Sequence, residues 1–330
     1  MGKFNRSANC LFGARYMLTQ IEALQGEIQG ALIGDDIEHV HRMRVGSRRL
    51  RNGLNLFYVC LPKKRAKTWR KAIRKITGAL GEARDLDIQI DLLNRACANT
   101  LEDSLKPGYN HLLKYLKKQR NIAQEKVSQT LGGLKERDSL GVMALSLKKL
   151  LRGSESTFLL TRPLYKQANK AIRSRLKHFL SYENFIDDPG KIYELHAMRI
   201  AGKHLRYTLE IFAPIYDRAL DPFVRSMKKI QDLLGEIHDN DVWIEWLPEF
   251  VKQETRRIEK NPDCRETLGL ILPGLLHFLE NRKHVRAEQY QDFLALWEEL
   301  QFQETWQSMR KVIKEPLNKG ANSAKNNIDL

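Results

Sequence analysis

Hydrophobic residues recur every three or four positions along nearly the whole chain, as in Leu11, Ala14, Leu18 and Ile21. This spacing places them on one face of an α-helix. The alternating pattern of a half-buried strand is missing, and so are Asn-Gly hairpin turns. The pattern therefore predicts an all-α protein.

Proline and glycine positions predict where these helices begin and end. The final stretch, NKGANSAKNNIDL, is small, polar and aperiodic, so we expect residues 318–330 to be disordered. Helices should end at Pro62 and Pro214, begin near Pro107, Pro163 and Pro189, and be separated at Gly132-Gly133.

Two blocks of the sequence occur twice, in the same order. HRMRVGSRRLRNGLNLF, from His41, and HAMRIAGKHLRYTLEIF, from His196, are identical at seven of seventeen positions. KITGALGEARDLDI, from Lys75, and KIQDLLGEIHDNDV, from Lys229, are identical at seven of fourteen. The offsets are 155 and 154 residues. Repetition at a nearly fixed period predicts two copies of one helical unit, residues 5–158 and 159–312.

Read as a helix at about 100° per residue, the first block separates into two faces. One face is apolar and includes Met43, Leu50, Leu54 and Phe57. The other carries a row of cations about 15 Å long, at 1.5 Å per residue. We call this row the first basic stripe: His41, Arg44, Arg48 and Arg51. The second block repeats the apolar face (Met198, Leu205, Leu209, Phe212) and gives the second basic stripe: His196, Arg199, Lys203 and Arg206.

The first basic stripe holds no acid three or four residues from its cations. Like charges at that spacing repel, and arginine, which matches phosphate oxygens in a bidentate fork, outnumbers lysine in both stripes. A solvated surface would explain one such helix, but the recurrence favours a polyanionic ligand that supplies the missing counter-charge. Other candidate binding residues are Arg49, Lys71, Arg74, Lys75, Lys166, Lys170, Arg173, Lys177, Arg225, Lys228 and Lys229.

The second block carries two carboxylates in a D-x-D pattern, Asp85 and Asp87 in one copy and Asp239 and Asp241 in the other. Such a pair can bind Mg²⁺, but Arg84 stands where the second copy has His238, which argues against a shared metal site. We expect the aspartates instead to cap a helix start or to orient stripe arginines from behind. The preceding glycines, Gly81 and Gly235, would permit close helix approach or a bend.

Composition narrows the class of ligand. The chain of 330 residues has 56 Lys and Arg against 40 Asp and Glu, a formal charge of +16, which attracts polyanions. No apolar run reaches the roughly 18 residues of a membrane span, and no signal peptide is evident, so we expect a cytoplasmic protein without a membrane partner. The four cysteines are scattered and are expected to be reduced thiols.

The doubled pattern H-x-M-R-V/I, R/K-x-L-R, L-x-x-F and LGE-x-x-D-x-D resembles the CHAD family, the conserved histidine α-helical domain. The likeness covers about residues 5–310. It implies two helical-bundle halves related by a pseudo-twofold, with a basic central groove or pore. It also implies binding of inorganic polyphosphate and association with polyphosphate granules, without catalysis, cofactor or metal. The implied binding residues are His41, Arg44, Arg48, Arg51, Arg74, His196, Arg199, Lys203, Arg206 and Lys228.

Two departures from the family pattern bear on function. Lys203 and His204 stand where the first copy has Arg48 and Arg49, so we expect the second half to bind less strongly at neutral pH. Nothing resembles the E-x-E-x-K strand of the triphosphate-tunnel barrel to which family members are often joined.

The leading hypothesis is therefore a non-enzymatic polyphosphate binder. One alternative is a nucleic-acid-binding protein, although the stripes lack interleaved aromatic residues for base stacking. The other is a metal-dependent polyphosphate or nucleotide hydrolase that uses the D-x-D aspartates.

Overall fold

The computed structural model describes residues 7–100, 102–153, 160–260 and 265–318. Every regular element in these ranges is a helix, which confirms the predicted all-α class. The first stretch of chain forms α1 (Ala8–Ile33), α2 (Ile37–Leu56), α3 (Lys63–Asn99), α4 (Lys106–Glu136) and α5 (Ser139–Leu151), with short 3-10 turns η1 (Tyr58–Cys60) and η2 (Asp103–Leu105). The second forms α6 (Arg162–Leu180), η3 (Glu183–Phe185), α7 (Ile192–Phe212), η4 (Ala213–Tyr216), α8 (Asp221–Glu259), α9 (Arg265–Phe302) and α10 (Thr305–Asn318).

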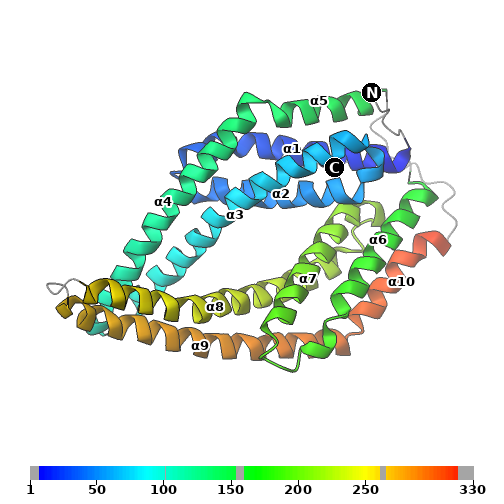
Figure 1. Ribbon diagram of the computed structural model, residues 1–330. Coiled ribbons are helices and arrows are strands. Elements are labelled where there is room, and N and C mark those ends of the chain that lie inside the picture. Colours follow the sequence, from blue (N-terminus) through cyan, green and yellow to red (C-terminus); the bar gives the residue numbers. More distant parts are fainter. Residues whose placement is uncertain (1–6, 101, 154–159, 261–264, 319–330) are drawn as a thin grey trace.

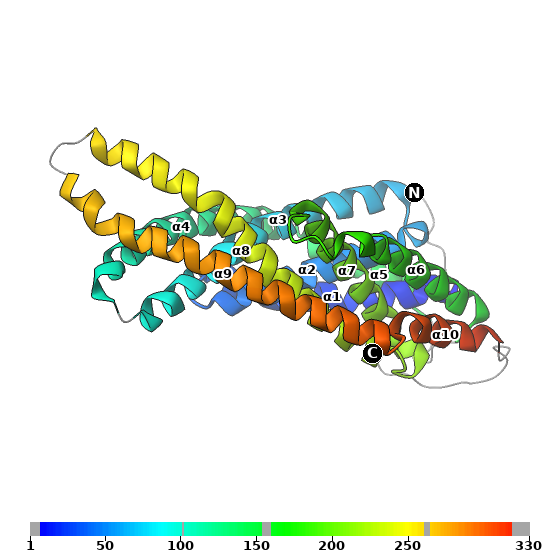
Figure 2. The same cartoon turned by 90° about the horizontal axis from the view of Figure 1, so that it is seen from below.

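The helices pack mainly against their neighbours in sequence, and the two stretches meet at two places. Helices α1, α2, α3 and α5 form one bundle, while α8 and α9 run together along the opposite side of the molecule (Figure 1). At one end α2 packs against α7; at the other, α4 packs against α9. Seen from below, α9 runs from one end of the molecule as far as α10, and α8 lies beside its first part (Figure 2). The stretches thus form a single structure with two junctions.

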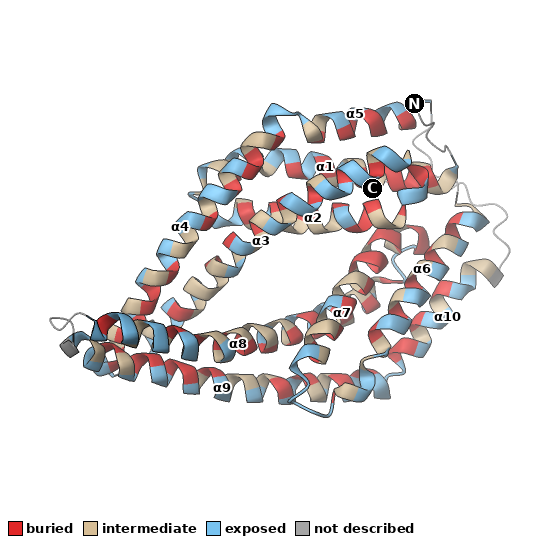
Figure 3. Ribbon diagram, in the orientation of Figure 1, coloured by how far each residue is buried: buried red, intermediate tan, exposed pale blue. Residues whose placement is uncertain are grey.

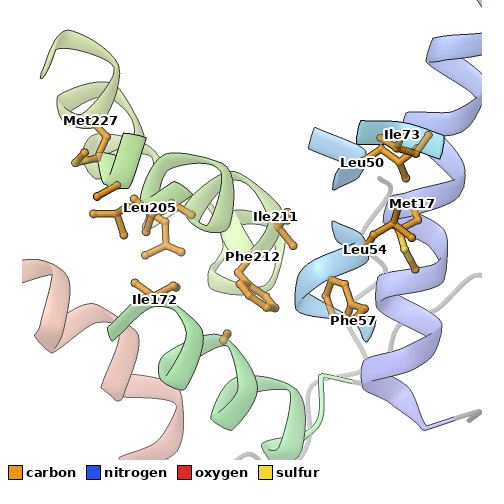
Figure 4. Packing of buried hydrophobic residues seen from close by; sticks show 14 of the residues in the cluster. Met17, Leu50, Leu54, Phe57, Ile73, Ile172, Leu205, Ile211, Phe212 and Met227 are labelled. Atoms are coloured by element: carbon orange, nitrogen blue, oxygen red, sulfur yellow. The ribbon is translucent and has the colours of Figure 1, made fainter. Parts of the chain in front are cut away.

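Aromatic rings close the first junction. Phe57 at the end of α2 and Phe212 at the end of α7 occupy matching positions in the two repeats, and their ring centroids are 6.1 Å apart. Phe12 of α1 stacks on Phe212 at 5.9 Å and contacts Phe57 at 6.1 Å. Figure 4 shows Phe57 and Phe212 pointing toward each other from their helices. All three side chains are almost fully buried, so the large apolar core continues across the junction.

The second junction rests on close backbone contact between α4 and α9. A Cβ atom added to Gly108 would lie 2.3 Å from the carbonyl oxygen of Ile271, and one added to Gly274 would lie 2.1 Å from that of Leu105. No larger residue fits here without moving the helices apart. A second cluster of buried residues, including Tyr109, Trp243 and Phe278, surrounds this contact. Buried positions line the inward sides of these helices in Figure 3.

Most predicted boundaries are confirmed and one is wrong. Pro62 precedes α3 and Pro214 follows α7, while the prolines expected near helix starts lie at or just before α4, α6 and α7. Gly132 and Gly133, however, lie inside α4, and the break falls after Glu136. Asp138, with a left-handed φ of 41°, makes that turn instead. The predicted division between residues 158 and 159 and the tail beyond Asn318 fall outside the described residues.

The expectation of four reduced thiols is also wrong. Cys10 of α1 and Cys60 of η1 form a disulfide with a Cα–Cα distance of 5.2 Å. The two residues are 50 positions apart, so no short cysteine spacing indicates the pair. Cys97 is free and partly buried, and Cys264 lies outside the described residues. Among the helices described, none is long and apolar enough to cross a membrane.

Candidate functional site

The repeated first block forms α2 and α7, and its two faces lie as the spacing predicts. Each residue of both predicted apolar faces, from Met43 to Phe57 and from Met198 to Phe212, is at most 1% exposed. The stripes lie beside these faces, where α2 and α7 approach each other. Because the apolar faces of α2 and α7 are buried, they fix the direction in which the neighbouring cations point.

Cations from the two stripes come together at this junction. The electrostatic field at Arg48 on α2 includes contributions from Arg199 and Arg206 on α7. Lys203 on α7 is in turn influenced by Arg44 and Arg48 on α2. Positions separated by about 150 residues in the sequence thus form one cationic cluster, which neither helix could form alone.

The cluster lies in a partly buried environment, and this changes its protonation. Burial lowers the pKa of Lys203 to about 7, with further lowering by Arg199, Arg48 and Arg44. The pKa of Arg48 and that of Arg199 are also lowered, in each case first by burial. Among the described residues, Arg48, Arg51 and Lys203 form no ion pair. The free protein therefore holds these positive charges close together at an electrostatic cost that an anion would relieve.

The first aspartate of each D-x-D pair supports a stripe arginine. Arg44 Nη2 donates a hydrogen bond to Asp85 Oδ1 at 2.9 Å, while Arg199 lies 4.0 Å from Asp239 in the second copy. Gly81 and Gly235 lie beneath these two guanidinium groups, with an added Cβ 3.8 and 3.7 Å from their Nε atoms. The predicted orienting role is confirmed. The close helix approach is not, because each glycine faces an arginine side chain.

The second aspartate of each pair has a different partner. Asp87 accepts a hydrogen bond from Arg120 on α4 at 2.6 Å, and Asp241 accepts one from Arg286 on α9 at 2.7 Å. Both aspartates are buried inside α3 and α8, so the alternative prediction that they cap a helix start is wrong. The two carboxylates of a D-x-D pair therefore point to different neighbouring helices: one pair connects α3 to α2 and α4, and the other connects α8 to α7 and α9.

Some counter-charges expected from a ligand are supplied by the protein itself. Besides the Asp85 contact, Arg49 Nη2 lies 3.0 Å from Glu210 on α7. Glu210 also lies 3.7 Å from Arg206. Both acids are distant in sequence from the first basic stripe, so counting acids within α2 could not find them, although Glu210 lies only four residues after Arg206 on α7. Arg49 connects the two helices through this contact.

The histidines that head the stripes have lowered pKa values. Burial is the main cause for His41, followed by the charge of Arg84, and burial is again the main cause for His196. Nδ1 of His196 lies 3.0 Å from Nδ1 of His238. Burial and the charge of Arg199 lower the pKa of His238 to about 3. At neutral pH both rings of this pair are therefore uncharged, and one nitrogen donates to the other.

A pocket of about 270 Å³ lies at this contact. Its lining comes from both repeats: Arg44 and Asp85 from one, and His196, Arg199, His238 and Asp239 from the other. The structure thus brings together Arg44 of the first basic stripe, His196 and Arg199 of the second, and the first aspartate of each D-x-D pair. His238 is a lining residue that the sequence reasoning considered only as a metal ligand.

A larger pocket, of about 610 Å³, lies between the end of α2 and the start of α3. We call it the α2–α3 basic pocket. Three of the predicted cations line it, Arg51, Lys71 and Arg74. Its remaining lining residues, which the repeat comparison missed, are Asn55, Tyr58, Lys63, Ala66, Lys67 and Arg70. No acid is among them. The cation spacing along KKRAKTWRKAIRK was a signal that could have indicated this surface.

The other predicted cations are exposed but separate. Lys75 is exposed on α3, and Arg225, Lys228 and Lys229 are exposed on α8. Lys166, Lys170, Arg173 and Lys177 are exposed on α6, which packs against α7 and α10. None of these residues lines the 270 Å³ pocket or the α2–α3 basic pocket. Within the described part of the chain, no group of three or more His, Cys, Asp or Glu residues could hold a metal ion.

Comparison with known proteins agrees with this fold. The family model for the CHAD domain matches residues 15–248, and the chain belongs to this family. No curated protein matches the chain. Among solved structures, it is similar to the CHAD domain from the plant Ricinus communis, with a TM-score of 0.54 and 23% identity over 88% of this chain and 94% of that one.

A second solved structure covers a similar part of the chain. PptA from Streptomyces chartreusis gives a TM-score of 0.49 and 16% identity over 86% of this chain and 99% of that one. At these values it supports no argument about this protein. The first likeness, at 23% identity, supports the fold alone.

Proposed function

We propose that this protein binds inorganic polyphosphate without catalysis, along the basic stripes of α2 and α7 and into the α2–α3 basic pocket. The observation that carries the proposal is the cluster formed by Arg44, Arg48, Arg199 and Lys203, in which cations from two repeats are held together. A linear chain of phosphates would neutralise several of these charges at once. Arginine guanidinium groups would bind its oxygens in bidentate fashion.

The arrangement of the cations in a continuous row supports a linear ligand. Arg51 is the last cation of the first basic stripe and also lines the α2–α3 basic pocket. The stripe therefore continues from the cluster at the α2–α7 junction into a pocket that contains Lys63, Lys67 and Arg70. This succession of cations suits an extended polyanion better than a compact one.

Polyphosphate suits this surface better than nucleic acid does. Stacking on aromatic side chains contributes much of the binding of unpaired bases. Tyr58 is the one Phe, Tyr or Trp residue that lines the α2–α3 basic pocket, and none of the stripe positions is Phe, Tyr or Trp. Phosphate contacts without base contacts are the pattern that polyphosphate requires.

The absence of catalysis is part of the proposal. The aspartates that a metal-dependent hydrolase would need are engaged by arginines, Asp85 by Arg44 and Asp87 by Arg120. Because these contacts point to different helices, the two carboxylates do not converge on a common point.

We further propose that the protein is cytoplasmic and associates with polyphosphate granules. Fluorescence microscopy of a tagged chain would test this.

The test is a binding measurement on a charge-reversed variant. Changing Arg44, Arg48, Arg199 and Arg206 together to Glu should weaken binding of long-chain polyphosphate at physiological salt by at least about 100-fold, since each lost charged contact contributes about 1 kcal/mol or more. The control changes four exposed cations away from the site, Lys114, Lys117, Lys118 and Arg256, to Glu. It alters net charge equally and should retain binding.

Circular dichroism should first establish that both variants fold. Equal binding by the stripe variant and wild type would refute the proposal. Displacement of polyphosphate by RNA or DNA at equal phosphate concentration would favour the nucleic-acid alternative. Release of orthophosphate with Mg²⁺ would favour the hydrolase.

A further inference from the structure

A third pocket, of about 660 Å³, lies at the second junction, where the end of α3 and the start of α4 meet α8 and α9. This is the size range of small-molecule sites. We call it the α3–α9 pocket. Only Leu92 is shared between its lining and that of the 270 Å³ pocket. None of the stripe residues lines it, so it is distinct from the site described above.

Arg282 is the unusual residue of this pocket. It is 8% exposed and lines the pocket from α9. Its guanidinium group lies 5.0 Å from the ring centroid of Phe278. Its two terminal nitrogens donate to amide oxygens, Nη1 to Asn240 at 3.4 Å and Nη2 to Asn281. Its Nε has no hydrogen-bond partner.

Within the described residues, Arg282 forms no ion pair with a carboxylate. Burial of a cation without a paired anion is costly, and buried charges are normally paired. The other buried arginine contacts of the same helices follow that rule, since Arg120 and Arg286 pair with Asp87 and Asp241. Arg282 therefore lacks the partner that the fold supplies elsewhere.

The first repeat shows that the fold does not need a cation at this position. Four residues before Arg120, which matches Arg286, α4 carries Leu116, a buried apolar residue. Three residues after Arg120 it carries Ala123, where α9 has Gln289. Leu86 precedes Asp87, where Asn240 precedes Asp241. An apolar group in one repeat is thus replaced by a hydrogen-bonded polar group in the other.

The polar residues of the second repeat form a hydrogen-bond network that reaches the pocket lining. Asn240 donates to Gln289 Oε1 at 2.7 Å, and Gln289 donates to Glu236 Oε2 at 3.0 Å. Both Gln289 and Glu236 line the pocket with Arg282. The network holds the guanidinium group in place beside the cavity. Arg282 itself contacts only the amides of Asn240 and Asn281, and Glu236 joins the network through Gln289, so no carboxylate lies against the guanidinium group.

The charge of the lining differs from that of the basic pockets. The lining carries two arginines, Arg95 and Arg282, and two glutamates, Glu102 and Glu236, none of which forms a described ion pair with another, while the α2–α3 basic pocket has no acid. A long polyanion would be repelled by the glutamates. A ligand with one anionic group would meet Arg282, and its neutral body would face Asn99, Thr100, Tyr109 and Asn281.

We propose that the α3–α9 pocket binds a small metabolite that carries one phosphate monoester or one carboxylate on a neutral polar body, with Arg282 as the residue that receives the anionic group. Tyr109, whose hydroxyl is hydrogen-bonded to His277 Nδ1 at 2.8 Å, also lines the pocket and contributes a hydrogen-bonding edge to the ligand body.

Calorimetric titration of the full chain with four probes tests the proposal: orthophosphate, glycerol 3-phosphate, adenosine monophosphate and gluconate. At least one should bind saturably with a Kd below about 1 mM. The first three probes against gluconate distinguish phosphate from carboxylate. Arg282→Leu, which installs the residue found in the first repeat, should weaken that binding at least tenfold. Arg256→Gln, at an exposed position of α8, is the matched control and should not.

Two further measurements separate this site from the basic stripes and from a folding defect. Arg282→Leu should bind long-chain polyphosphate as wild type does, so failure of one proposal does not imply failure of the other. Thr100→Trp, which fills the pocket from the end of α3, should also abolish binding of the small probe. This second variant tests the proposal even if Arg282→Leu does not fold. Absence of binding by all four probes, or undiminished binding by a folded variant, would overturn the proposal.

Discussion

The two repeats have equivalent helices and the same sequence motif, but their charged side chains are arranged differently. In the first, Arg44 is hydrogen-bonded to Asp85 and Arg51 opens into a pocket without acids. In the second, Arg199 is 4.0 Å from Asp239, and Arg206 lies near Glu210. The position that matches Glu210 in the first repeat is Asn55, which lines the α2–α3 basic pocket. A single acid therefore separates an open cationic surface from a partly neutralised one.

This difference indicates that the repeats divide their roles. The second repeat contributes Lys203 and Arg199 to the shared cluster, while Glu210 connects α7 to Arg49 of α2. The first repeat contributes the cluster's other half and continues it into the larger pocket. Matching sequence positions thus serve junction stability in one copy and ligand access in the other.

The largest expected effect concerns a feature that the repeats share. Asp87→Ala and Asp241→Ala should each lower the free energy of unfolding by about 3–5 kcal/mol, because each leaves a buried arginine without its carboxylate. Urea unfolding followed by circular dichroism measures this. A large loss for one variant and none for the other would show that the equivalent contacts are not equivalent in energy.

An intermediate effect comes from exchanging the residues that differ. Asn55→Glu places an acid in the α2–α3 basic pocket and should weaken polyphosphate binding about fivefold, since one charge contact near the surface amounts to about 1 kcal/mol. Glu210→Asn should strengthen it by a similar factor, by freeing Arg49 and Arg206. Titration calorimetry at fixed salt measures both. Asn55→Gln is the size-matched control, and equal affinities for all three variants would contradict the division of roles.

The smallest expected effect is a pH dependence that arises from Lys203. Its pKa of about 7 in the free protein is set by burial and by Arg199, Arg48 and Arg44, with Asp239 acting in the opposite direction. Bound phosphates would raise that pKa, so binding takes up a proton, and affinity should fall as pH rises from about 7 to 9. Lys203→Arg keeps its charge throughout this range.

We expect affinity to fall about threefold for wild type between pH 7 and 9, which corresponds to a fraction of one pKa unit, and to stay nearly constant for Lys203→Arg. Calorimetry in buffers of different ionisation enthalpy would also detect the proton uptake. The same pH dependence in both proteins would assign it to another group.

Helix positions were predictable because their causes are local. The three-and-four spacing fixed the buried faces of α2 and α7, and prolines fixed most boundaries. Where the prediction of a boundary failed, at Gly132-Gly133, helix packing outweighed a weak local preference, since a glycine inside a helix costs only about 1 kcal/mol relative to alanine. The orienting role of Asp85 was predictable for a different reason: the motif occurs twice at nearly the same distance from the stripe, 41 residues from Arg44 to Asp85 and 40 from Arg199 to Asp239.

The sequence by itself determined the helical class, the repeat, the two basic stripes and their family, because each depends on residues close together or on direct comparison of two segments. Only the tertiary structure decided which side chains from distant parts of the chain contact each other. The contacts of Glu210 with Arg49, of Cys10 with Cys60 and of Arg282 with Asn240 join positions far apart in the chain or on different helices. Burial of Lys203 and of Arg282 follows in the same way from the packing of several helices, and it is burial that changes their chemistry.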